Sequence, residues 1–318
     1  MPEVPSRRSK VTVVGAGSVG ATIAFASQLR GVANTIALYD LNEKKTRAEV
    51  LDMNHGKAFT PPVEVVGSSD PEVTRGSDII VVTAGAKQKP GQTRLDLAEA
   101  NVNMMRSMGP QLLDLSPDAL LCIVTNPCDV VTYATQKFTG LPTNRVFGSG
   151  TVLDSARLRY LVAEHLRVNP TNVHAYIAGE HGDSEIALWS SATVGATPLL
   201  QWDERDRPMT AADRERIHKD VVNAAYEIIE GKGATWYAVG LAVTRILEAV
   251  LDDANTILPV SSLLDDYYGL SDVVLSIPSI VDRAGVQDVL TVPLDDAELA
   301  GLRSSADAVQ TVARSLGL

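Results

Sequence analysis

Residues 10–30 read KVTVVGAGSVGATIAFASQLR, and this stretch decides the fold of the first half of the chain. Its β-branched start predicts a strand, and the small and apolar residues at its end predict a helix. The GAGSVG turn between them fits the G-x-G-x-x-G pattern. In that pattern Gly15 makes the tight turn, Gly17 lets the backbone approach a pyrophosphate, and Gly20 packs helix on strand. A strand, this turn and a helix together predict a dinucleotide site, with the pyrophosphate at the helix N-terminus.

Asp40 closes the next predicted strand, residues 35–39, and lies 20 positions after Gly20. A carboxylate at this distance accepts hydrogen bonds from the ribose hydroxyls of the adenosine. Its charge would repel the 2′-phosphate of NADP, so the sequence predicts NAD as the cofactor. The alternative is that Asp40 only caps a helix or makes a turn in solvent.

Three more apolar runs follow in the first half, at residues 63–67, 78–84 and 120–125. Nearly continuous apolar runs are typical of parallel strands that are covered on both faces. Helical patterns at residues 42–57 and 95–115 alternate with these runs. The first half therefore predicts an α/β fold with a doubly wound parallel sheet.

The pattern changes after about residue 149, where less regular strands are mixed with long helices. These helices are expected at residues 153–167, 211–230, 235–251 and from 296 onward. We expect two domains. Residues 1–149 would form a dinucleotide-binding domain of the Rossmann type, and residues 150–318 an α+β substrate domain.

Composition and charge limit the class of protein and its partners. Of the 318 residues, 45% are hydrophobic and 21% are charged, which is typical of a folded globular protein. The net charge of -11 would repel phosphate backbones and anionic lipid surfaces. We therefore expect neither nucleic acid nor a membrane as a partner.

The chain has two cysteines, Cys122 and Cys128, which lie in or beside an apolar run. Their spacing gives neither a disulfide framework nor a metal site, so we expect no metal and a reducing, cytoplasmic location. Whether Cys128 is reactive or only buried stays open. Arg7, Arg8 and Lys10 before the apolar stretch resemble a signal peptide, but a phosphate-binding turn explains the glycines better.

Four later segments carry more polar residues than a core requires: AGAKQKPGQTRLDL at 84–97, TNPCD at 125–129, LDSARLR at 153–159 and GEHGDSE at 179–185. Together with the glycine turn, they resemble the lactate and malate dehydrogenase family, with every motif in the family's order. The resemblance covers nearly the whole chain. It implies an NAD-dependent enzyme that transfers a hydride between the cofactor and its substrate.

The resemblance assigns the chemistry to four side chains. His181 would donate the proton that an alkoxide needs after hydride transfer, and Asp154 would orient the imidazole ring and stabilise its charge. Arg157, on the same helix face as Asp154, would grip the substrate carboxylate through two parallel N–H bonds. Arg94, in a loop expected to close as a lid, would stabilise the polarised carbonyl. The alternative is a mere surface ion pair between Asp154 and Arg157.

The resemblance also implies the substrate. Malate dehydrogenases carry arginine at the position of Gln88, where it pairs with the second carboxylate of oxaloacetate. A neutral Gln88 favours pyruvate, because closure over oxaloacetate would bury an unpaired carboxylate. Malate dehydrogenase activity is the alternative. Further substrate contacts are expected from Asn126 and Thr235. The cofactor contacts are expected from Gly15, Gly17, Val19, Gly20, Asp40, Gly85, Ala86, Val124, Asn126 and Ser149.

Arg159 and His174 are expected to flank the active site. In bacterial members of the family with this arrangement, matching residues bind fructose 1,6-bisphosphate across a two-fold subunit interface. The resemblance therefore implies this effector and a homotetramer; the alternative is ordinary surface charge. Two other classes stay open. A non-catalytic NAD-binding sensor would need no proton donor, and an NAD-dependent glycoside hydrolase would need a metal site that the cysteines do not supply.

Overall fold

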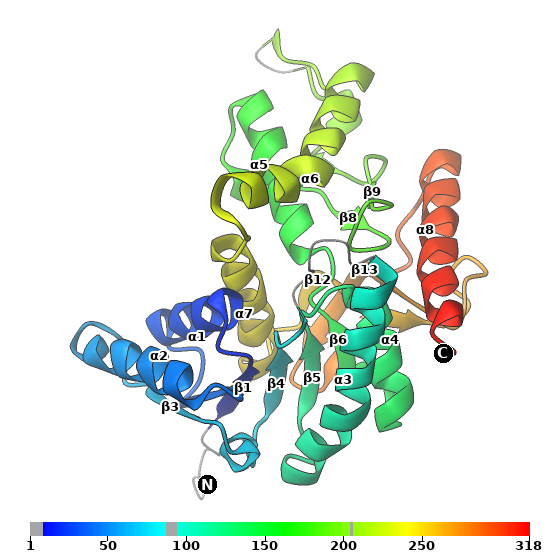
Figure 1. The fold of residues 1–318 in the computed structure, drawn as a ribbon. Coiled ribbons are helices and arrows are strands. Elements are labelled where there is room, and N and C mark those ends of the chain that lie inside the picture. Colours follow the sequence, from blue (N-terminus) through cyan, green and yellow to red (C-terminus); the bar gives the residue numbers. More distant parts are fainter. Residues whose placement is uncertain (1–8, 87–93, 204–205) are drawn as a thin grey trace, which may run out of the picture.

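The computed structural model describes residues 9–86, 94–203 and 206–318. Within these residues the centre is a nine-stranded sheet of order β14-β13-β12-β6-β5-β4-β1-β2-β3, with helices on both faces (Figure 1). Its parallel part comprises β1 (Lys10–Val14), β2 (Thr35–Tyr39), β3 (Glu64–Ser68), β4 (Ile79–Val82), β5 (Leu120–Ile123) and β6 (Val146–Gly148). The predicted doubly wound α/β fold is confirmed. The strand order reverses between β1 and β4, and ligands bind beside such a point.

Three strands from the second half extend the same sheet beyond β6. They are β12 (Thr256–Leu264), β13 (Val273–Asp282) and β14 (Gly285–Val289), which pair antiparallel. Ser261 of β12 pairs with Gly148 of β6 and so joins the two halves of the chain. The sequence predicted irregular strands here but not their place in the first sheet, because local patterns do not specify long-range pairing.

Helices bury both faces of the sheet. One face is covered by α1 (Ser18–Arg30) and α7 (Tyr237–Leu251), and α2 (Glu43–His55) packs at the β3 edge. The other face is covered by α3 (Arg94–Leu115), α4 (Cys128–Thr139) and α8 (Asp296–Ser315). Alternate residues of β4 divide the core, since Ile79 packs into the first cluster and Ile80 into the second.

A second group of elements lies over the carboxyl ends of the parallel strands, with α5 (Val152–Leu166) and α6 (Ala211–Lys232) at its centre (Figure 1). Leu158 and Val162 of α5 pack with Ile217 and Val221 of α6. The short strands here are β7 (Val173–His174), β8 (Ile177–Ala178), β9 (Ile186–Ala187), β10 (Thr193–Val194) and β11 (Thr197–Pro198). Short 3-10 helices occur at Lys57–Phe59, Pro71–Thr74, Thr143–Arg145, Pro170–Asn172 and Leu199–Gln201.

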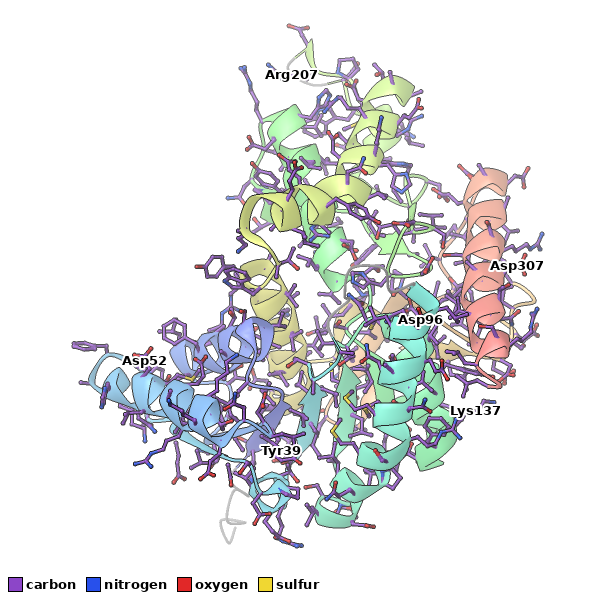
Figure 2. All side chains as sticks on the ribbon, in the orientation of Figure 1. Tyr39, Asp52, Asp96, Lys137, Arg207 and Asp307 are labelled. Carbon is purple, nitrogen blue, oxygen red and sulfur yellow. The ribbon has the colours of Figure 1, made fainter. Side chains whose placement is uncertain are left out.

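Charged side chains cover the outer sides of the helices. Lys137 of α4 and Asp307 of α8 project from the surface (Figure 2), and Lys137 pairs with Asp272 at 2.9 Å. In the described part of the chain, no helix has the length and apolar character needed to cross a membrane.

Candidate active site

The glycine turn forms a cradle in which the main chain faces a cavity. Gly15 has a φ of +104°, and a Cβ there would lie 2.7 Å from the backbone nitrogen of Ala84. A Cβ at Gly20 would lie 1.9 Å from the carbonyl oxygen of Gly15. At Gly17, the N-cap of α1, no atom of the described residues lies within 4 Å of the Cβ position. The turn is closed behind Gly15 and Gly20 and open at Gly17, as a pyrophosphate requires.

Asp40 lies at the end of β2, beside the glycine turn. Its Oδ2 accepts a hydrogen bond from the N–H of Ala16 at 2.7 Å, and its Oδ1 accepts one from the N–H of Asn42 at 2.9 Å. These bonds show that Asp40 stabilises the turn, the role that the sequence analysis gave as the alternative to cofactor binding. Each carboxylate oxygen has a further lone pair, so ribose hydroxyls can still donate to it.

A cavity of about 1010 Å³ connects the glycine turn with α5 and with the segment before α7. All ten residues expected to contact the cofactor line it, from Gly15 to Ser149. His181, Arg157 and Thr235 line the same cavity. Its size matches the upper end of the range for ligand pockets, about 300–1,000 Å³, so a dinucleotide and a small substrate can share it.

Sequence reasoning missed several residues at this cavity. Buried Asn101 of α3 accepts the N–H of Ala86 at 2.8 Å and donates to the carbonyl oxygen of Asn126 at 2.7 Å. It thereby ties together the loops that follow β4 and β5. Lys45 and Ser107 also line the cavity. Nothing in the pattern of α2 or α3 marks these residues, because polar side chains are common on helices.

Asp154, His181 and Arg157 form a charged cluster at the cavity, in which Asp154 is buried and the other two side chains are partly buried. The Nδ1 of His181 lies 2.6 Å from one carboxylate oxygen of Asp154, and the Nη1 of Arg157 lies 2.6 Å from the other. Asp154 is only 2% exposed, so these two partners replace water at both of its oxygens. The structure therefore brings together three side chains that sequence reasoning selected. The Asp154–Arg157 ion pair exists, but it is not the surface pair of the alternative expectation.

The pKa values in the cluster follow from burial and charge. Burial disfavours the imidazolium, but Asp154 outweighs this effect and raises the pKa of His181 to about 9. Burial also disfavours the Asp154 carboxylate, yet His181 and Arg157 hold the pKa of Asp154 below its usual value. The imidazole is therefore protonated at neutral pH, and an imidazolium can donate a proton to a developing alkoxide.

Asp129, in the TNPCD segment, supports the loop that carries His181. Its carboxylate accepts the backbone N–H of His181 at 2.7 Å and the hydroxyl of Ser261 at 2.5 Å. Burial raises the pKa of Asp129 to about 6, against the effect of these hydrogen bonds. Sequence reasoning selected the segment but missed this residue, since both of its partners are distant in the chain.

Neither of the two substrate residues expected in the lid loop has a described side chain. Gln88 lies outside the described residues. The backbone of Arg94 begins α3, one residue earlier than expected, and its side chain is also outside the description. The roles expected of Gln88 and Arg94 therefore stay predictions.

Arg159 and His174 are not among the described residues that line the cavity. The Nε of Arg159 donates to the carbonyl oxygen of Ala175 at 3.0 Å, and its guanidinium lies 4.8 Å from the ring centre of Tyr176. His174 is exposed on β7. Both residues thus lie outside the cavity, and their expected role stays a prediction.

Cys128 is fully buried at the start of α4. Its thiol donates to the carbonyl oxygen of Ile123 at 3.3 Å. Burial raises the pKa of Cys128 to about 12, so the reactive thiolate does not form at neutral pH. The question left open by the sequence is answered in favour of a buried, unreactive thiol.

A possible metal-binding group overlaps the charged cluster. Among the described residues, ligand atoms of Asp154, His181 and Glu185 lie within 4.8 Å of one another. Both oxygens of Asp154 are already bonded, however, and the guanidinium of Arg157 beside them would repel a cation. This group is better suited to holding protons than to holding a metal ion.

The two ends of the cavity suit different parts of one reaction. The open turn at Gly17 fits a dinucleotide, and the imidazolium beside a guanidinium fits a carbonyl compound that accepts a hydride. The fold and site define a dinucleotide-dependent dehydrogenase. Residues 9–148 match the family model of the lactate/malate dehydrogenase NAD binding domain, and residues 151–313 match that of the lactate/malate dehydrogenase alpha/beta C-terminal domain. The chain belongs to the lactate/malate dehydrogenase family.

Individual relatives resemble the chain over its full length. It is 52% identical to an L-lactate dehydrogenase of Bifidobacterium animalis subsp. lactis, covering 100% of both chains. It is 48% identical to an L-lactate dehydrogenase of Acetivibrio thermocellus, over 97% of this chain and 98% of that protein. A crystal structure of the minor L-lactate dehydrogenase from Enterococcus mundtii matches with a TM-score of 0.93 and 40% identity, covering 97% of this chain and 98% of that one.

Proposed function

We propose that the chain is an NAD-dependent L-lactate dehydrogenase, which reduces pyruvate to L-lactate and catalyses the reverse reaction. The observation that carries the proposal is the hydrogen-bonded His181–Asp154–Arg157 cluster in the same cavity as the glycine turn. A sensor that only bound NAD would gain nothing from an imidazolium held by a buried carboxylate. The L-lactate dehydrogenases among its relatives support the same substrate.

Each part of the cluster has a separate task in the reaction. NADH, when bound, supplies the hydride. Asp154 uses one of the five N–H groups of Arg157, and the rest of the guanidinium can donate to the substrate carboxylate. His181 donates its proton to the oxygen that gains charge as the hydride arrives. Asp154 fixes the imidazole ring and stabilises its positive charge before the transfer. In the reverse reaction, neutral His181 accepts the proton from the lactate hydroxyl.

We propose that the ten residues at the cavity wall from Gly15 to Ser149 bind NAD. Asn126 and Thr235 would contact the substrate beside the nicotinamide, and both line the cavity. The boundary between the cofactor and substrate domains would lie between residues 149 and 150. Two family models with limits at residues 148 and 151 support that boundary.

Gln88 and Arg94 are proposed to complete the substrate site when the loop between β4 and α3 closes. Arg94 would stabilise the carbonyl oxygen, and Gln88 would favour the methyl group of pyruvate over a second carboxylate. Steady-state kcat/KM values for pyruvate and oxaloacetate with NADH test the proposal. We expect pyruvate to be preferred, and Gln88→Arg to move the preference toward oxaloacetate. Faster reduction of oxaloacetate by the wild type would instead make the protein a malate dehydrogenase.

We further propose a homotetramer that fructose 1,6-bisphosphate activates through Arg159 and His174. The half-exposed apolar side chains of Phe25, Leu29 and Leu241 on α1 and α7, two helices that pack together, support burial against another subunit. Light scattering gives the subunit number, and pyruvate saturation curves with and without the effector test activation. A curve unchanged by the effector would remove this part of the proposal.

We also propose a location for the enzyme. The buried, unpaired Cys122 and Cys128 support a reducing compartment, and we propose the cytoplasm. A fluorescent fusion of the full chain would test this location.

A further inference from the structure

Glu185 is a second acidic residue at the catalytic centre that the mechanism above does not use. Its side chain is 5% exposed, and its Oε1 has no hydrogen-bond partner among the described residues. One of its carboxylate oxygens lies within 4.8 Å of the ligand atoms of Asp154 and His181. A buried carboxyl oxygen without a partner is costly, so its position next to the proton donor calls for an explanation.

The main chain holds Glu185 firmly at this place. Its N–H donates to the carbonyl oxygen of Gly182 at 3.3 Å, and its own carbonyl oxygen accepts the Nε2–H of His218 from α6 at 3.0 Å. Glu185 directly precedes β9, which pairs with β8. These bonds fix the backbone of Glu185 beside the cluster, and the residue is buried there at 5% exposure.

We propose that Glu185 is a positioning residue of the catalytic centre: its carboxyl group releases a proton to solvent at alkaline pH, and the resulting charge keeps His181 protonated. The inference deepens the proposed function, because it concerns the proton donor of that reaction. Burial, followed by the negative charge of Asp154, raises the pKa of Glu185 to about 9, against the opposing effects of His181 and Arg157.

The charges that face Glu185 favour this order of proton loss. α5 contributes the anion of Asp154 and the cation of Arg157, and the loop contributes the imidazolium of His181 and the exposed Asp183. Water screens Asp183, so the other charges that act on Glu185, those of Asp154, His181 and Arg157, sum to one positive charge while Glu185 is neutral. The anion of Asp129 acts on His181 and favours the imidazolium in either state of Glu185. Loss of the Glu185 proton balances them, whereas loss of the His181 proton does so only by removing the catalytic acid.

Two other groups near the cluster do not titrate with Glu185. Asp129 has a pKa of about 6, so it is already charged before alkaline pH is reached. Burial lowers the pKa of His218 from its usual value, so this α6 residue is neutral there. The change in charge above neutral pH therefore belongs to the Glu185–His181 pair, and an ionised Glu185 raises the pKa of His181.

The test compares wild type, Glu185→Gln and Asp183→Asn at neutral to strongly alkaline pH. Both substitutions turn a carboxyl group into an amide, but Asp183 is exposed. Two quantities are measured: kcat/KM for pyruvate, and the Kd of the NADH complex for oxamate, a pyruvate analogue that accepts no hydride. We expect the alkaline midpoint of both to fall by about one pH unit in Glu185→Gln, the scale for one charge at about 4–6 Å. Asp183→Asn should leave both midpoints in place.

The outcomes separate this inference from the proposed function. If wild type does not reduce pyruvate, the proposed function fails. If wild type is active and the Glu185→Gln midpoint stays in place, only the role of Glu185 is overturned. A purely structural role would lower activity equally at every pH without moving the midpoint. Should Glu185→Gln not fold, Glu185→Met removes the same charge at similar volume and must show the same shift.

Discussion

The glycine turn and the charged cluster line the same cavity, but they act through different parts of the chain. At the turn, backbone closes on backbone, and a Cβ at Gly20 would lie 1.9 Å from the carbonyl oxygen of Gly15. In the cluster, side chains from separate segments neutralise one another, with Asp154 bonded to both His181 and Arg157. Space is therefore the critical quantity at the turn, and charge is the critical quantity in the cluster. Substitutions that change only one of these quantities test the distinction.

The largest effect is expected when the proton donor is removed from the cluster. His181→Asn keeps a polar side chain but has no titratable group, so kcat for pyruvate should fall about 10²- to 10⁴-fold, the usual worth of acid–base catalysis. The affinity for NADH should stay within about twofold, because the turn is untouched. Steady-state kinetics and a fluorescence titration with NADH measure the two quantities.

A matched control for this substitution is His174→Asn, at an exposed residue that is not among those described as lining the cavity. It should leave kcat without effector unchanged. If His181→Asn weakened NADH binding as much as it lowered kcat, the two regions would not be separable, and the comparison would fail.

At the turn, one added carbon atom should act through steric overlap alone. Gly20→Ala forces the backbone apart at Gly15, and overpacking of this kind costs about 1–3 kcal/mol. We expect NADH to bind about 10- to 100-fold more weakly, since 1.4 kcal/mol corresponds to a factor of about ten. Tm should fall as well.

A Cβ at the turn can displace the backbone or exclude the pyrophosphate, and Gly17→Ala separates these two effects. No described atom lies within 4 Å of the new Cβ, so the fold should keep its Tm. The methyl group instead occupies space at the N-terminus of α1 that the pyrophosphate needs, and NADH binding alone should weaken. Thermal unfolding of Gly17→Ala and Gly20→Ala tests this argument. Equal losses of Tm in the two variants would contradict it.

The same difference explains what the sequence could predict. The turn is contiguous, and the role of each glycine depends on its own backbone, so residues 15–20 were sufficient to predict it. His181, Asp154 and Arg157 were predicted because the resemblance to a family supplied their roles, not because the sequence shows that they meet. Asp129 and Glu185 belong to recognised segments, but their roles depend on how separate parts of the chain pack. The same limit applies to β12, whose pairing with β6 has no local pattern.

The next effect is the pH dependence of the cluster. The pKa of His181 is raised to about 9, so the acid form required for pyruvate reduction is fully present near neutral pH and is lost above about pH 9. kcat/KM for pyruvate should then fall up to about tenfold per pH unit. Lactate oxidation needs the neutral imidazole and should rise over the same range. Initial rates in both directions across pH check this, and a midpoint near the ordinary histidine value would show that Asp154 does not control the imidazole.

The smallest effect is expected at Asp40, the one residue of the turn region where charge and hydrogen bonding both act. Asp40→Asn keeps a carbonyl oxygen that can accept the N–H of Ala16, but it removes the negative charge facing a 2′-phosphate. The ratio of kcat/KM for NADH to that for NADPH should fall about 3- to 10-fold, because a partly screened charge is worth only about 1 kcal/mol. Asp40→Ala serves as the control, since it also removes the acceptor and should weaken binding of both cofactors. An unchanged ratio in Asp40→Asn would mean that Asp40 only stabilises the turn, and that the turn region works through space alone.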